Sequence, residues 1–215
     1  MSLIDGSSLA GPHPVLREVG VRLRRLHEVK VPGFGCLSDA SWDDKGGFSL
    51  RHDSWRGFLE GVVDEVRALA GSYAVASAVA DAAADAVEAR REALAAVEVG
   101  SLCHGDLKVG HVLVGDDRLA GVIDWGDAVV GDPVWDIARF AHRADASSLS
   151  RLLEGYDPGG ALVDDLAWRI PLYSALWQLV DAIVEHRLGN PVDGSLQAVM
   201  ESLTSARAVT LGGKG

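Results

Sequence analysis

Residues that could carry chemistry concentrate in one short stretch of this chain, residues 102–114. An apolar approach reaches the turn His104-Gly105-Asp106, and a second apolar run leads away from it. A further acidic residue, Asp124, follows the next apolar run. Phosphoryl transfer needs one carboxylate to orient the attacking hydroxyl and another to hold magnesium. The order of these residues therefore predicts a phosphoryl-transfer site.

The spacing of Asp106 and His111 gives these residues separate roles. It is the spacing of the protein-kinase catalytic loop H-R-D-x-x-x-x-N, with His in place of Asn. We expect a catalytic loop over 104–111 in which Asp106 is the catalytic residue, and a metal-binding loop over 123–127. Asp124 would give an oxygen ligand to Mg²⁺, a hard cation. For His111 two roles stay open, metal ligand or scaffold of the loop.

Four further polar residues are candidates for support of the site. His104 is expected to be a buried histidine that supports the loop rather than a base. Asp127 is either a support for the backbone around Asp124 or a solvated turn residue. Asp132 precedes a proline and should cap the next helix. Asp136 lies in the first turn of that helix and could accept hydrogen bonds from the catalytic loop.

Hydrophobic periodicity predicts a predominantly helical α+β fold. A small β-hairpin carries the catalytic and metal-binding loops, and residues 1–13 are expected to be irregular. Residues 33–52, rich in glycine, are predicted to form a long loop with a short hairpin. Strands are predicted over 101–104, 111–114 and 119–123. Helices are predicted from Pro14, from Asp53 or Ser54, over 74–98, from Asp132-Pro133, over 147–156, from Pro171 and over about 196–208.

Composition narrows the classes of function and partner. The net charge of −11 argues against a nucleic-acid partner, since affinity for phosphate backbones comes from clustered Lys and Arg. The same charge would suit a cationic small substrate, or simply keep the protein soluble. The chain lacks the uninterrupted apolar run of a membrane span, and its first residues lack the pattern of a secretory signal. Two distant cysteines fit a reducing compartment, so a cytoplasmic protein is expected.

Taken as an ordered set, these motifs resemble the aminoglycoside phosphotransferase and choline kinase superfamily. The matching segments are Leu23-x-x-Leu26-His27, Pro32-Gly33-Phe34-Gly35, His104-Gly105-Asp106-Leu107, Ile123-Asp124-Trp125-Gly126-Asp127-Ala128 and Gly131-Asp132-Pro133-x-x-Asp136. The resemblance implies a kinase-like fold that moves the γ-phosphate of ATP or GTP onto a hydroxyl of a small molecule.

The resemblance also implies residue roles and an acceptor class. Asp106 matches the catalytic base and Asp124 the magnesium-binding aspartate. Lys108 matches a position that is often basic and would contact the nucleotide phosphate. His111 marks a variant of the loop that is similar to that of macrolide phosphotransferases. An antibiotic-type acceptor, aminoglycoside or macrolide, is therefore favoured over a choline-like alcohol or a sugar.

The family places a β-rich N-lobe before the first helix, and here only 13 residues precede Pro14. Five short strands with their turns need roughly 40 residues. We therefore expect residues 14–215 to be a kinase-like C-lobe without an N-terminal β-lobe. Its uncovered face would bind a second copy of the chain or a separate N-lobe.

Two other functions are compatible with these residues. One is a catalytically incompetent binding module, or a truncated C-lobe that needs a partner, so the activity of this chain alone stays open. The other is a metal-dependent phosphoesterase, which the single set of ligands disfavours. The late residues Trp168, Tyr173, Trp177 and Asp181 could form a substrate wall, although aromatic residues at helical spacing are more often core.

Overall fold

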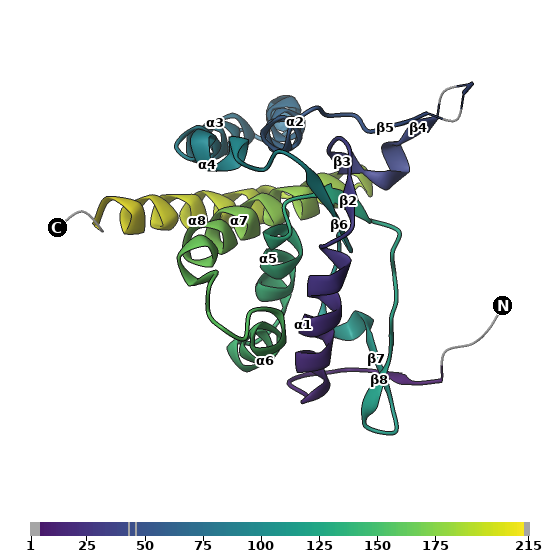
Figure 1. The fold of residues 1–215 in the computed structure, drawn as a ribbon. Helices are drawn as coiled ribbons and strands as arrows, with labels where there is room; N and C mark the ends of the chain where they lie inside the picture. The colour runs from purple at the N-terminus through teal and green to yellow at the C-terminus, as the bar shows by residue number, and fades with distance from the viewer. Residues whose placement is uncertain (1–4, 43, 46, 213–215) are drawn as a thin grey trace. The chain divides into compact units, whose positions relative to one another are not determined.

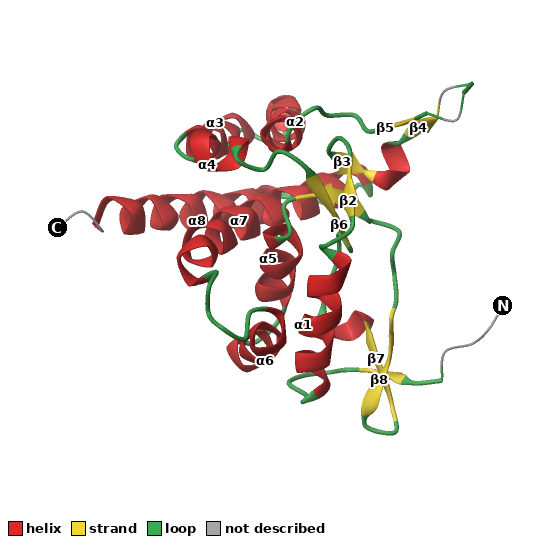
Figure 2. Ribbon diagram, viewed as in Figure 1, coloured by secondary structure: helices red, strands yellow, loops and turns green. Residues whose placement is uncertain are grey.

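The computed structural model describes residues 5–42, 44–45 and 47–212, with side chains up to Leu203. The chain divides into two compact units (Figure 1). The first unit comprises Met1–Arg51 and Val99–Ile170, and the second comprises His52–Glu98 and Pro171–Gly215. The residues predicted for chemistry all belong to the first unit, which also holds the strands (Figure 2).

Three small antiparallel sheets lie in the first unit. The first has the strand order β1-β7-β8, the second β2-β6-β9-β3, and the third is the hairpin β4–β5. The catalytic loop connects β6 to β7, and the metal-binding loop connects β8 to β9. Because β7 pairs with β8 in the first sheet and β6 pairs with β9 in the second, the two loops lie side by side. The strands are β1 (Ser7–Ser8), β2 (Lys30–Val31), β3 (Gly35–Cys36), β4 (Ser41–Trp42), β5 (Phe48–Ser49), β6 (Gly100–Cys103), β7 (Val112–Gly115), β8 (Arg118–Val122) and β9 (Val129–Gly131).

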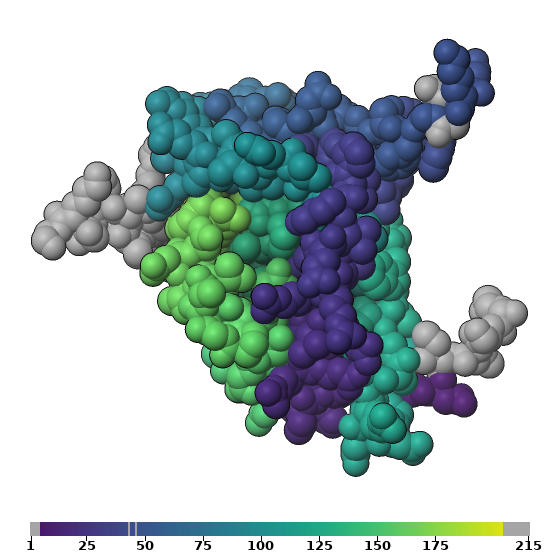
Figure 3. All heavy atoms as spheres, viewed as in Figure 1, coloured from purple at the N-terminus to yellow at the C-terminus, as the bar shows by residue number. Residues whose placement is uncertain are grey.

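Helices of the first unit pack unusually closely at one crossing. A Cβ atom on Gly20 of α1 would lie 2.0 Å from the carbonyl oxygen of Leu152, and one on Gly155 of α6 would lie 1.9 Å from that of Arg17. The two backbones therefore touch where neither helix has a side chain. In the space-filling view α1 (purple) lies between α6 (green) and the β7–β8 hairpin (teal) (Figure 3). The helices are α1 (Val15–Leu26), α5 (Val134–Arg143) and α6 (Ala146–Tyr156).

The second unit is helical and has an apolar core. Trp55 of α2 is fully buried and donates its indole N–H to the hydroxyl of Tyr173 over 2.8 Å. Tyr173 and Trp177 are both buried, so these two aromatic residues belong to the core rather than to an open substrate wall. The helices of the second unit are α2 (Trp55–Ala68), α3 (Ala76–Glu88), α4 (Arg91–Ala95), α8 (Asp193–Gly212) and the larger part of α7 (Val163–Arg187).

The predicted fold class, α+β and mostly helical, is confirmed, but two helix predictions are wrong. Pro171 lies inside α7 and does not begin it, although proline lacks an N–H and usually ends a helix. Burial of Leu166 before it and of Leu172 after it keeps both flanking turns in place. The helix predicted over 74–98 is two helices, because the chain leaves helical geometry at Arg90 (φ −116°, ψ 14°).

Four strands, β1, β2, β3 and β9, were not predicted, since a strand of two or three residues has no measurable periodicity. The segment expected to be irregular contains β1, where Ser7 pairs with Val114. In β9, Val130 pairs with both Leu102 and Gly35. Among the described residues, no helix combines the length and the apolar character needed to cross a membrane.

Candidate active site

The turn at the start of the catalytic loop depends on a glycine. Gly105 has φ +83°, a left-handed conformation that disfavours residues with a side chain. A Cβ atom at this position would lie 1.7 Å from the backbone carbonyl oxygen of Asp127. The catalytic loop and the metal-binding loop therefore touch backbone to backbone at Gly105, which fixes the distance between them.

Asp136 holds this turn from the buried side. Its carboxylate accepts hydrogen bonds from the backbone N–H of His104 (2.7 Å) and of Gly105 (2.9 Å). Asp136 is completely buried on α5, so these donors satisfy a charge that water cannot reach. The helix thus orients the loop through the contact predicted for Asp136 from the sequence.

Asp106 projects from this turn and is held by two cationic side chains. Arg139 of α5 donates from Nε to Oδ1 over 2.7 Å, and Lys108 donates from Nζ to Oδ2 over 2.8 Å. Burial raises the pKa of Asp106, but the hydrogen bonds from Lys108 and Arg139 outweigh it and keep the pKa below its usual 3.8. Asp106 is therefore an ionised acceptor at neutral pH, fixed in direction by Arg139.

His104 supports the loop with both ring nitrogens. Nε2 donates to the carbonyl oxygen of Ile123 over 2.9 Å, and Nδ1 accepts from the backbone N–H of Asp106 over 3.3 Å. Since a carbonyl only accepts, the proton lies on Nε2 and the imidazole is neutral. His104 thus links the metal-binding loop to the catalytic loop and has no nitrogen left to act as a base.

His111 and Asp124 meet at the open side of the site. Nδ1 of His111 lies 3.0 Å from the backbone carbonyl oxygen of Asp106, and Nε2 lies 3.1 Å from Oδ2 of Asp124. Asp124 has φ +67° and a 58% exposed side chain, whereas His111 is only 9% exposed. One ligand atom from each of Asp106, His111 and Asp124 lies within 4.8 Å of the other two, so the three could hold one metal ion.

The remaining candidates lie at the margin of the site. Asp132 is buried, caps α5 through the N–H of Val134 (2.9 Å) and pairs with Arg169 over 2.7 Å. It therefore stabilises the helix that carries Asp136 and Arg139. Asp127 is exposed, and the structure brings its backbone carbonyl, rather than its carboxylate, against the catalytic loop.

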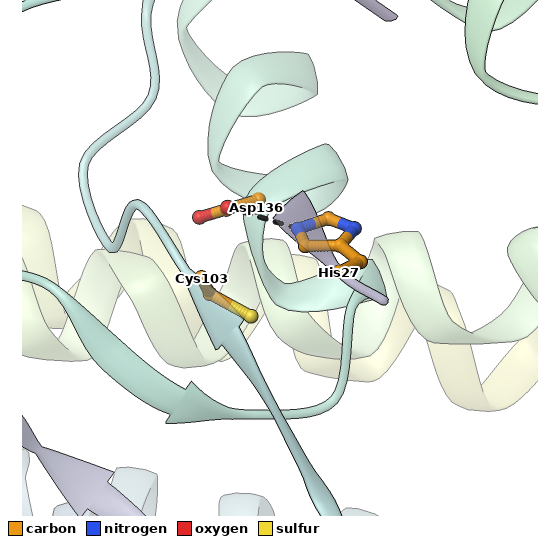
Figure 4. Close-up of side chains that lie close together, drawn as sticks. All are labelled: His27, Cys103 and Asp136. Atoms are coloured by element: carbon orange, nitrogen blue, oxygen red, sulfur yellow. Dashed lines mark hydrogen bonds and ion pairs between the residues drawn. The ribbon is translucent and has the colours of Figure 1, made fainter. Parts of the chain in front are cut away.

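A buried network behind Asp136 was missed from the sequence (Figure 4). His27, the C-cap residue of α1, lies 3.2 Å from Oδ2 of Asp136 through Nε2 and 2.8 Å from the hydroxyl of Tyr156 through Nδ1. With its proton on Nε2, His27 donates to Asp136 and accepts from Tyr156. Burial raises the pKa of Tyr156, which keeps this hydroxyl protonated as the donor.

Cys103 lies beside His27 and Asp136, and together the three residues have the composition of a metal site. The hydrogen bonds of His27 already occupy both ring nitrogens. Burial, followed by the charge of Asp136, raises the pKa of the Cys103 thiol well above its usual value, so the sulfur stays protonated. A metal needs a thiolate ligand, and this group of residues is therefore a hydrogen-bonded support of the catalytic loop.

An apolar pocket opens beside the catalytic loop. Its volume is about 370 Å³, and it lies between α1 and the residues that flank the two loops. Leu23 and Leu26 line it from α1, Leu107 and Trp125 line it from the two loops, and Val122 lines it from the end of β8. The ring of Trp125 lies 4.5 Å from that of His104, so the pocket wall is continuous with the site.

Comparisons with known proteins give relatives over most of the chain. The model of the family described as "Phosphotransferase enzyme family" matches residues 1–171. The uncharacterized protein YcbJ of Bacillus subtilis (strain 168) is 38% identical over 64 residues, which are 29% of this chain and 21% of YcbJ. This relative is thus matched over only about a fifth of its length.

Solved structures show the fold. A provisionally assigned fructosamine-3-kinase from Thermobifida fusca YX-ER1 is 20% identical, with a TM-score of 0.70 over 97% of this chain and 69% of its own. Choline kinase LicA from Streptococcus pneumoniae is 16% identical, with a TM-score of 0.62 over 95% and 69%. Macrolide 2'-phosphotransferase MphH from Brachybacterium faecium is 22% identical, with a TM-score of 0.58 over 94% and 68%. The predicted kinase-like fold is confirmed.

Proposed function

The chain belongs to the phosphotransferase enzyme family, as the sequence motifs predicted, and from this premise we propose that it transfers the γ-phosphoryl group of ATP or GTP to a hydroxyl of a small molecule. The observation that carries the proposal is the convergence of Asp106, His111 and Asp124, whose ligand atoms lie within 4.8 Å of one another. A proton acceptor and a cation site thus lie next to each other, as phosphoryl transfer requires.

Asp106 orients the acceptor. The hydroxyl oxygen bonds to the γ-phosphorus as the bond from that phosphorus to the bridging β–γ oxygen breaks, and the hydroxyl proton passes to the carboxylate of Asp106. Because hydrogen bonds from Lys108 and Arg139 keep the pKa of Asp106 low, it is a weak base. Its larger contribution is to hold the hydroxyl in line with the phosphorus.

Lys108 and the cation site face the phosphates. Lys108 is 38% exposed and can turn from Asp106 to a phosphate oxygen, so it serves as the nucleotide contact. His111 and Asp124 would hold Mg²⁺, and their donor set of one nitrogen and carboxylate oxygens fits a divalent cation. When bound, the cation neutralises the charge of the β- and γ-phosphates.

An antibiotic-type acceptor, aminoglycoside or macrolide, is the substrate class we favour. A thermostable mutant of aminoglycoside phosphotransferase APH(4)-Ia with 24% identity has been solved with AMP-PNP and hygromycin B, which supports nucleotide use by this fold. The net charge of −11 favours a cationic acceptor, and the histidine at position 111 favours the macrolide branch. A cytoplasmic enzyme would meet such compounds after their entry into the cell.

A matched pair of variants tests the proposal. Asp124 and Asp116 are both exposed aspartates with positive φ, 67° and 51°, a conformation that asparagine also tolerates. Asp124→Asn should reduce Mg²⁺-dependent phosphate transfer at least about 100-fold, by loss of charge stabilisation. Asp116→Asn, in the turn between β7 and β8, should leave it unchanged.

The measurement is transfer of the labelled γ-phosphate from ATP or GTP to a panel of aminoglycosides, macrolides, choline and sugars, with calorimetric MgATP binding in parallel. The proposal is supported if the original chain phosphorylates one member of the panel and Asp124→Asn does not. Full transfer by Asp124→Asn would contradict it. If the chain does not bind MgATP at all, the result would favour the alternative function, a catalytically incompetent binding module.

A further inference from the structure

We propose that His111 makes the cation site of this chain select first-row transition cations, such as Mn²⁺ and Co²⁺, over Mg²⁺. The inference rests on the proposed function, because it concerns the same cation site. It goes further by assigning a cation preference to one residue of this chain.

The first step is the fixed orientation of the His111 ring. His111 ends the short 3₁₀ turn Val109–His111, and its side chain is nine-tenths buried. Nδ1 lies 3.0 Å from the backbone carbonyl oxygen of Asp106, which can only accept a hydrogen bond. The proton of the neutral ring is therefore on Nδ1, and the lone pair on Nε2 points out of the loop. A backbone carbonyl that fixes the tautomer in this way is typical of metal-binding histidines.

The second step is the group that Nε2 faces. Oδ2 of Asp124 lies 3.1 Å away, and a carboxylate oxygen also offers only lone pairs. At this distance a protonated Nε2 would donate a hydrogen bond to the carboxylate, and a divalent cation that replaces that proton would be held by the same two atoms. Neighbouring ligands of an octahedral cation with bonds of about 2.1 Å lie about 3.0 Å apart. The observed distance therefore also fits two adjacent ligands of one cation.

The third step is the chemistry of the ligands. Mg²⁺ prefers oxygen, binds water tightly and gains little from an imidazole nitrogen. Affinity for a site with a nitrogen ligand rises along the first-row series from Mn²⁺ to Co²⁺. An asparagine in place of His111 would offer an amide oxygen and remove this gain. The histidine therefore changes the preference of the site, while Asp124 sets its affinity for every divalent cation.

The test measures binding of the non-hydrolysable analogue AMP-PNP by calorimetry with Mg²⁺, Mn²⁺ or Co²⁺ in excess. The original chain should bind the analogue most tightly with Co²⁺ and least tightly with Mg²⁺. His111→Asn should weaken binding with Co²⁺ about tenfold or more and leave binding with Mg²⁺ unchanged or stronger. The visible absorption of Co²⁺ should lose its nitrogen-ligand signature in this variant.

Two control variants separate the explanations. Asp124→Asn should weaken binding with all three cations and keep their order. His186→Asn, on the second unit, reports adventitious cobalt binding to a half-buried histidine that contacts Tyr73, and it should leave the order of the cations unchanged. Cation-dependent binding with the same order in the original chain and in His111→Asn would overturn the inference and leave the proposed function intact. No cation-dependent binding in the original chain would overturn both.

Discussion

The catalytic loop and the metal-binding loop meet in one site, yet they are held in opposite ways. Asp106 is 10% exposed and receives hydrogen bonds from two cationic side chains, while Asp136 accepts hydrogen bonds from the two backbone N–H groups that precede it. Asp124 is 58% exposed, and its side chain contacts the ring of His111. A group that orients a hydroxyl must be rigid, whereas a group that receives a solvated cation must be accessible. The difference indicates that buried hydrogen bonds and ion pairs fix Asp106, whereas the side chain of Asp124 stays accessible to solvent.

The largest expected effect contrasts a glycine from each loop. Gly105→Ala places a Cβ atom 1.7 Å from the backbone of Asp127 at φ +83°, and it should lower the free energy of unfolding by about 3 kcal/mol or more. In Gly126→Ala the Cβ atom meets nothing within 4 Å, so the change should stay within about 0.5 kcal/mol. Urea unfolding measures both. An equal loss of unfolding free energy in both variants would contradict the view that the catalytic loop is tightly packed and the metal-binding loop is not.

An intermediate effect concerns Arg139 and acid. Because the pKa of Asp106 is below 3.8 in the folded chain, its interactions stabilise the protein above the unfolded pKa and are lost as the pH falls through the folded pKa. Arg139→Met should therefore destabilise the chain by about 2 kcal/mol at pH 7 and by progressively less as the pH falls below 3.8 and through the folded pKa of Asp106. The measurement is thermal unfolding across this range.

Arg143→Met, at the end of the same helix, is the matched control. It keeps the hydrogen bond from Arg139 to Asp106, so any change in stability should not follow the protonation of Asp106. A loss in Arg139→Met that stays constant until the protein unfolds in acid would show that Arg139 acts by packing rather than through the charge of Asp106.

The smallest effect concerns the buried support of the catalytic loop. Tyr156→Phe removes the hydroxyl that donates to His27 and should cost about 1 kcal/mol of stability. It should also raise the hydrogen-exchange rate of the His104 and Gly105 amides, which Asp136 holds, more than that of amides in β7. A uniform rise in exchange would mean that the hydroxyl stabilises the fold without acting on the loop.

Much of this site could be predicted from local spacing. Asp106, Asp124 and Asp136 belong to short motifs in which chain order fixes the neighbourhood, so the sequence placed them near one another. Arg139 also had a local signal, since residues three apart on a helix share a face and Asp136 was already placed. That signal went unused because an arginine at the edge of an apolar helix is usually a solvated residue.

The rest depended on tertiary structure. His27 and Tyr156 are 129 residues apart, and nothing near either residue indicates the other. The strand β9 and the passage of α7 through Pro171 likewise follow from pairing and burial that distant segments provide. Local patterns thus pointed to the residues that we propose react, and they missed most of the structure that orients them.

The side-chain-free crossing of α1 and α6 has a consequence for how this chain tolerates mutation. Gly20 and Gly155 lie outside the site, but every other amino acid would drive a carbon atom into the opposite backbone. His27 directly follows α1 and Tyr156 ends α6. A larger side chain at the crossing would therefore move these two residues apart and break the contacts that hold Asp136. A saturation-mutagenesis map scored only for function should therefore show these two glycines as intolerant as Asp106. Such a map would give the false impression of a second active centre.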